Sequence, residues 1–174
     1  MNDPAPTSRS AFSALIFLFV GRRPLRTLIR ILLLIAIGVP LFKFALIPVV
    51  VSGDSMMPTY QDGQFGFANG LIYRFRDPLP GDIVVIEMAG RQTMYLKRIL
   101  AGPGDRVFFQ DGTLMVNDQP VMEPYVIMSN RWRTTEETLG PTEFFVAGDN
   151  RAMPEEWHIM GVVDRAYIAG RVLF

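Results

Sequence analysis

A serine in a tight turn is the first residue of this sequence that could carry a covalent reaction. Ser55 follows an apolar run that ends at Val51, is preceded by Gly53 and Asp54, and is followed three residues later by Pro58. These neighbours predict a sharp turn that presents the hydroxyl at the end of a strand. The turn also leaves the Ser55 amide free to stabilise an oxyanion, an interaction worth about 3 kcal/mol. The alternative is that Ser55 and Asp54 only satisfy hydrogen bonds within the turn.

A lysine within an apolar strand is the second candidate. Fifteen of the seventeen basic residues are arginine, and the two lysines are Lys43 and Lys97. In the run TMYLKRILAG, alternation puts Lys97 on one largely apolar face and Arg98 on the other, so we expect at least one of them to be desolvated. Lowering a lysine pKa from about 10.4 toward about 8 would make Lys97 a general base near neutral pH. The alternative is a lysine at a strand edge whose amine stays in water.

The composition excludes several other kinds of site. Cysteine is absent, which rules out a thiol nucleophile, a disulfide framework and a Cys-rich metal site. His158 is the single histidine, so a multi-histidine zinc site is excluded, and a Ser-His-Asp triad would need His158 with Asp149 or Asp164. We expect no cofactor and no metal. The excess of arginine lies near the N-terminus and no basic run continues into the rest of the chain, so we expect no nucleic-acid partner.

Short apolar or alternating runs follow one another through residues 44–174. The runs predicted to be strands are QFGFANG, GDIVVIEM, TMYLKRILAG, DRVFFQDG, TLMVNDQP, TEFFVAGDN and RAYIAGRVLF. GPGDR, QDG and NDQP predict tight turns. The more polar residues 125–141, which include Trp132, are predicted to pass over the surface. No long helical pattern separates these runs, so the sequence predicts a mainly β domain with antiparallel strands in a barrel-like or sandwich arrangement.

An apolar segment precedes the β-rich part of the chain. Residues 24–43 approach the length of about 20 mostly apolar residues that a membrane span requires. Arg26 and Arg30 lie near the start of the segment, where their side chains can reach the interface, and Lys43 lies at its end. We therefore predict a transmembrane helix here. A cleavable signal peptide is the alternative, although no small-x-small site follows.

The charge around this segment predicts its orientation. Basic residues before it place residues 1–23 in the cytoplasm and residues 44–174 outside, as an extracytoplasmic catalytic domain. A second apolar segment, residues 11–20, has only about half the length of a span. We expect it to lie at the membrane interface.

Four segments, in this order, resemble the signature boxes of the bacterial type I signal peptidases. They are SGDSMMPT, PGDIVVIEM, YLKRILAGPGD and FFVAGDNR, with the apolar segment directly ahead of them. The resemblance extends over residues 25–171. In that family the serine of SM-x-P is the nucleophile and the lysine of K-R is its base. The resemblance therefore implies these roles for Ser55 and Lys97.

The resemblance also implies which residues surround the pair. Gly53 and Asp54 would form the oxyanion turn. The residues implied to support the site are Met56, Pro58, Asp149 and Arg151. Many members of the family have a serine two residues before the nucleophile that donates to the oxyanion, and this chain has Gly53 there. The oxyanion hole would then depend on the Ser55 amide.

The last box departs further from the family pattern. In GDNRAMPEEWHIMG, Pro154 occupies the position of the serine that orients the lysine in the family, and His158 occupies the position of an arginine. Asp149 and Arg151 are expected to pair as a structural brace. What orients Lys97 is left open.

The resemblance implies a single-pass serine endopeptidase of the cytoplasmic (inner) membrane, with its catalytic domain on the periplasmic side. It would cleave signal peptides from exported preproteins after small residues at the third and first positions before the scissile bond. Expected partners are preprotein signal peptides, the lipid bilayer and the secretion translocon.

Four alternatives remain. A specialised paralogue is favoured by the altered last box, and a catalytically decayed paralogue would bind signal sequences without cutting them. A hydrolase could use the His158 triad instead. An intramolecular Ser/Lys protease of the repressor-cleaving kind would carry a soluble DNA-binding N-terminus, where this chain has an apolar segment.

Overall fold

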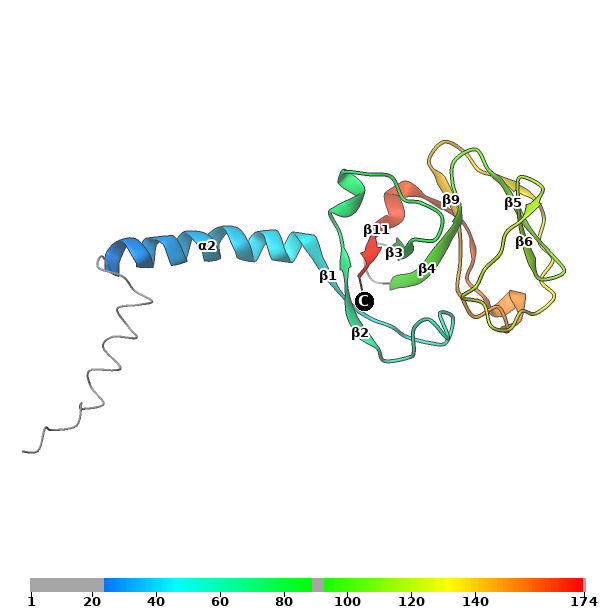
Figure 1. The fold of residues 1–174 in the computed structure, drawn as a ribbon, viewed down its shortest axis with the longest axis horizontal. Helices are drawn as coiled ribbons and strands as arrows, with labels where there is room; N and C mark the ends of the chain where they lie inside the picture. The colour runs from blue at the N-terminus through cyan, green and yellow to red at the C-terminus, as the bar shows by residue number, and fades with distance from the viewer. Residues whose placement is uncertain (1–23, 89–92, 174) are drawn as a thin grey trace, which may run out of the picture. The chain divides into compact units, whose positions relative to one another are not determined.

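The computed structural model describes residues 24–88 and 93–173, which fall into two units divided between Lys43 and Phe44 (Figure 1). The predicted N-terminal region 1–23 and its apolar segment 11–20 lie outside the described residues.

Helix α2 comprises Pro24–Ala45. A proline suits the first position of a helix, because its fixed φ is helical and no N–H is needed there. Large apolar side chains along the helix are exposed, with Leu34 at 71% and Ile37 at 65%. Among the described residues, no helix combines the length and the apolar character that crossing a membrane requires. The predicted transmembrane helix over 24–43 is therefore not confirmed.

Within the described residues, seven strands form the larger sheet, in the order β1-β2-β11-β3-β4-β9-β10. Its strands are β1 Leu46–Val50, β2 Phe65–Asn69, β3 Ile83–Met88, β4 Thr93–Ala101, β9 Glu143–Ala147, β10 Gly161–Asp164 and β11 Ile168–Val172. Every neighbouring pair is antiparallel. The predicted mainly β fold with antiparallel strands is confirmed.

A smaller antiparallel sheet has the order β7-β6-β5-β8. Its strands are β5 Arg106–Gln110, β6 Thr113–Val116, β7 Gln119–Pro120 and β8 Glu137–Thr138. The 3₁₀ turns of the described chain are η1 Ile72–Arg74, η2 Glu155–Trp157 and η3 Arg165–Tyr167. Asp111 and Gly112 have positive φ at the predicted QDG turn between β5 and β6, and Asn117 and Asp118 have it at NDQP. The predicted turn residues thus supply the left-handed backbone conformations that these connections need.

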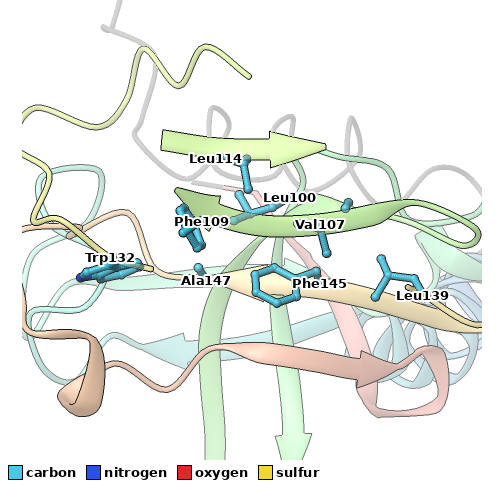
Figure 2. Packing of buried hydrophobic residues seen from close by; sticks show 9 residues of the cluster. Leu100, Val107, Phe109, Leu114, Trp132, Leu139, Phe145 and Ala147 are labelled. Carbon is cyan, nitrogen blue, oxygen red and sulfur yellow. The ribbon is translucent and has the colours of Figure 1, made fainter. Parts of the chain in front are cut away.

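A hydrophobic core lies between the two sheets. Figure 2 shows Val107 and Phe109 on β5 and Leu114 on β6 facing Phe145 and Ala147 on β9. All five are at most 3% exposed. This packing attaches the smaller sheet to the part of the larger sheet that contains β4 and β9.

Trp132 joins this core, although residues 125–141 were predicted to pass over the surface. The indole is 2% exposed, its ring packs edge-on against Phe109 at 5.3 Å, and its Nε1 donates to the Met153 carbonyl at 2.8 Å. The large apolar area of an indole outweighs the polar character of its sequence neighbours. The prediction is therefore wrong at Trp132 and at Leu139, which is 3% exposed in the same core, while Arg131 and Arg133 are exposed.

Strand β4 has different neighbours at its two ends. β3 pairs with it from Thr93 to Arg98, whereas β9 pairs with it only from Arg98 onward, with a register shift between Ile99 and Ala101. Among the described residues, the 93–97 half of β4 therefore has a strand on one side only. Lys97 lies in this half.

Candidate active site

Ser55 and Lys97 meet at one point of the larger unit. The Lys97 Nζ lies 2.9 Å from the Ser55 Oγ, which is a hydrogen-bond distance. β4 supplies the lysine, and the turn that follows β1 supplies the serine. The Lys97 side chain is almost fully enclosed, since the residue is 3% exposed.

Burial lowers the pKa of Lys97 from 10.5 to about 8, and the more distant charge of Asp149 opposes this shift. The neighbouring base behaves differently. Burial also acts to lower the pKa of Arg98, but its hydrogen bonds to Asp149 and the charge of that carboxylate outweigh burial and raise it. Alternation along β4 thus places two bases side by side. The charge of Arg98 is balanced by the bound Asp149 carboxylate, whereas Lys97 has no bound carboxylate among the described residues. Of the two, Lys97 is the one that can release its proton near neutral pH.

The serine turn has a conformation that only glycine adopts readily. Gly53 has a φ of 84°, and its N–H donates to the Asp62 carboxylate at 2.8 Å. Since that N–H is already used, it does not serve the expected oxyanion site. No described residue accepts a hydrogen bond from the Ser55 amide. The Ser55 amide is therefore the donor that the turn offers to an oxyanion.

Asn150 fixes the serine turn from the loop after β9. Its backbone N–H donates to the Ser55 carbonyl at 3.0 Å, and its Nδ2 donates to the Asp54 carbonyl at 3.0 Å. Met56 anchors the turn from the other side, because its side chain is 1% exposed within the core. Sequence reasoning singled out Met56 but missed Asn150, although Asn150 is part of the GDN run.

Asp149 and Arg151 do not form the expected brace with each other. Arg98 donates to both oxygens of Asp149, at 2.8 and 2.6 Å, and Thr59 donates to the same carboxylate at 2.5 Å. Arg151 instead donates to both oxygens of Glu123, at 2.7 and 2.6 Å. Each ion finds a forked partner on another segment, which satisfies a buried charge better than the sequence neighbour would. Arg98, Thr59 and Glu123 were not predicted as site residues.

His158 is not assembled into a triad. The residue is 7% exposed, and neither of its ring nitrogens has a hydrogen-bond partner among the described residues. Burial, followed by the charges of Lys97 and Arg151, lowers its pKa to about 4. The acids that could have joined it are bound elsewhere, Asp149 to Arg98 and Asp164 to Thr142 and the Ala166 amide. The imidazole packs edge-on against Trp132 instead, with the ring centres 4.7 Å apart.

Pro154 supplies no group that could orient Lys97. It is the residue directly before η2. Among the described residues, the Ser55 hydroxyl is the hydrogen-bond partner that Lys97 has.

A pocket of about 140 Å³ opens beside the pair, between β1 and β4. The residues that line it are Pro48, Val49, Val50, Val51, Ser52, Ser55, Met56, Val85, Met94, Tyr95, Leu96 and Lys97. β1 pairs only with β2, so within the described chain both strands present an unpaired edge to this region. An extended peptide could pair with such an edge.

The site residues can transfer a proton. Within the described ranges, 24–88 and 93–173, histidine, aspartate and glutamate side chains form no group of three that could hold a metal ion. A serine hydroxyl beside a buried lysine of lowered pKa, with a free backbone amide next to it, is the arrangement typical of Ser/Lys hydrolases.

Comparison with known proteins assigns the family. Residues 25–174 match the family described as signal peptidase, peptidase S26. The chain is 30% identical over 157 residues to signal peptidase I of Bacillus licheniformis, covering 83% of each protein. It is 28% identical over 150 residues to signal peptidase IB of Staphylococcus aureus, covering 76% of this chain and 78% of that protein. The chain therefore belongs to the signal peptidase family, and it is a peptidase.

A solved structure was also found. The crystal structure of a signal peptidase I from Enterococcus faecalis aligns with a TM-score of 0.44 at 25% identity, covering 56% of this chain and 97% of that one.

Proposed function

We propose that this protein is a signal peptidase that cleaves signal peptides from exported preproteins, with Ser55 as nucleophile and Lys97 as general base. The observation that carries the proposal is the 2.9 Å contact between the Ser55 hydroxyl and the amine of a buried lysine. Family membership supports the substrate class. The intact pair also favours an active enzyme over a decayed paralogue.

In this mechanism the neutral Lys97 amine removes the hydroxyl proton as the Ser55 oxygen attacks the scissile carbonyl. The resulting oxyanion receives a hydrogen bond from the Ser55 amide. When the C–N bond breaks, the Lys97 ammonium returns the proton to the departing amine. A water then attacks the acyl group while Lys97 accepts its proton. When the ester bond to Ser55 breaks, the Lys97 ammonium returns this proton to the Ser55 oxygen and restores the hydroxyl.

The proposed substrate lies in the pocket between β1 and β4 as an added strand. Backbone hydrogen bonds to the strand edges would give affinity, and the pocket would select the side chains. Because the pocket is small, it suits small residues at the first and third positions before the cut.

This specificity gives a direct test with a purified preprotein. Replacing alanine at the first position before the cut by phenylalanine should lower kcat/KM by more than about 100-fold, since the larger ring would overfill the pocket. The Ser55→Ala protein, which lacks the proposed nucleophile, serves as the negative control. Equal cleavage of the two preproteins by wild type would refute the proposed specificity.

We further propose that the N-terminal part attaches the enzyme to a membrane and that residues 44–174 face outward. Support comes from the arginines that precede the apolar run and from the exposed apolar side chains of α2. A reporter fused after Phe174 should behave as an exported protein in cells. Activity of a reporter that works only in the cytoplasm would contradict this orientation.

A further inference from the structure

A loop beside the serine turn exposes large apolar side chains. Met122 is 90% exposed, Ile127 is 76% exposed and Met128 is 68% exposed. Clustered exposure of this kind often marks a binding surface.

This loop is fixed to the framework of the active site. Glu123 receives the forked hydrogen bonds of Arg151, and Asn130 donates its backbone N–H to the Arg151 carbonyl at 2.7 Å. The guanidinium of Arg98 lies 3.8 Å from the centre of the Tyr125 ring. Arg98 directly follows Lys97 and binds Asp149. The loop that carries the exposed side chains is thus held by Arg98 and Arg151, which also order the active site.

Ile127 and Met128 form one wall of a second pocket, of about 180 Å³. The residues that line it are Met57, Pro58, Ile127, Met128, Asp149, Asn150 and Ala152. The carboxylate of Asp149 is already bound by Arg98 and Thr59, so the pocket offers mainly apolar contacts to a ligand.

The two pockets share the serine turn. Ser52, Ser55 and Met56 line the first pocket, whereas Met57 and Pro58 line the second. Asn150, which holds the Ser55 and Asp54 carbonyls, also lines the second. A peptide whose reactive carbonyl lies at Ser55 and whose preceding residues fill the first pocket would bring its following residues near Met57 and Pro58 if it continues across this turn.

We propose that the pocket formed by Met57, Pro58, Ile127 and Met128 binds an apolar side chain of the substrate from the first three positions after the scissile bond. This inference rests on the proposed peptidase function of Ser55. It makes Ile127 and Met128 specificity-determining residues. A substrate side chain is favoured over a lipid surface as the occupant, because the site is a hollow lined by Met57 and Pro58, which follow Ser55 by two and three residues.

Two peptides test the proposal. They are identical up to the cut. One carries leucine at all three positions after the cut, and the other carries aspartate at these positions. Wild type should cleave the leucine peptide at least tenfold faster in kcat/KM, since an apolar pocket rejects a carboxylate. Met128→Lys should reverse or remove this preference, because its ammonium can pair with aspartate. Met122→Lys is the matched control, because Met122 is exposed on the same loop without lining the pocket, and it should leave the preference unchanged.

Binding of the same labelled peptides to the Ser55→Ala protein gives a second readout that does not need cleavage. The same preference should appear in Kd. If wild type cleaves neither peptide while the preference for leucine in Kd remains, the proposed peptidase function is refuted, whereas the proposed binding pocket is supported. Equal kcat/KM and equal Kd for both peptides would overturn the pocket. So would a Met128→Lys protein that loses affinity for lipid vesicles but keeps its preference for leucine.

Discussion

Replacing Lys97 by arginine should abolish preprotein cleavage as completely as replacing it by alanine. Arginine keeps the charge and most of the length of the side chain, but it cannot give up its proton at any pH where the protein is folded. Without a base, the Ser55 hydroxyl stays protonated and weakly nucleophilic. We expect a loss of about 10³-fold or more in kcat for both variants. Circular dichroism of each variant would check that it is folded.

Lys43→Arg is the matched control for this change. Lys43 is exposed near the end of α2, so an arginine should replace it at little cost. Ser55 and Lys97 act as a unit in the proposed mechanism, and the double change to alanine should therefore be little worse than either single change. Substantial Ser55-dependent cleavage by the Lys97→Arg protein would exclude the lysine as the base.

Gly148→Ala should also cause a large loss, although Gly148 carries no reactive group. A Cβ at this position would lie 2.1 Å from the Ser55 carbonyl oxygen and 2.6 and 2.8 Å from ring atoms of His158. The methyl group would push the serine turn or the imidazole away, and a displacement of about 1 Å at a nucleophile can cost about 100-fold in rate. Overpacking should also lower the free energy of unfolding by about 1–3 kcal/mol. Preprotein cleavage and urea denaturation measure the two effects separately.

Gly102→Ala is a suitable control, because a Cβ there would meet only ring atoms of Phe144 at the ordinary distances of 3.6 and 3.8 Å. It should leave cleavage within about twofold of wild type. If Gly148→Ala were equally harmless, the close packing of Gly148 against the serine turn would have no role in activity.

Local pattern in the sequence predicted most of the fold. All seven predicted strands are present, because alternation and turn residues are encoded within each segment. β1 and β10 were not predicted, and neither was the two-residue strand β8, Glu137–Thr138. β1 follows the apolar run of α2 with Lys43 as the only charged residue near the junction, and β10 has only four residues, Gly161–Asp164, so neither has a pattern of its own.

The site was predictable where one residue has an unusual chemistry. Lys97 stands out as a lysine among arginines in an apolar strand, and Ser55 stands out through the turn around it. The partners of Asp149 could not be predicted, because Arg98 lies 51 residues away along the chain and reaches it only through the pairing of β4 with β9. The environment of His158 could not be predicted either, because it depends on residues that are distant in the sequence. Its burial without a hydrogen-bond partner depends on Trp132 and on the loop that contains Gly148.

The pH dependence of kcat/KM for Ser55-dependent cleavage tests the central claim most directly. The free enzyme must have a neutral lysine to begin the reaction, so kcat/KM should rise with pH through an apparent pKa near 8, the lowered value of Lys97, and level off above it. A histidine base would instead become active as pH rises through the pKa of about 4 of His158. A rise complete below pH 6, with no further increase through pH 8, would contradict the assignment of Lys97 as the base.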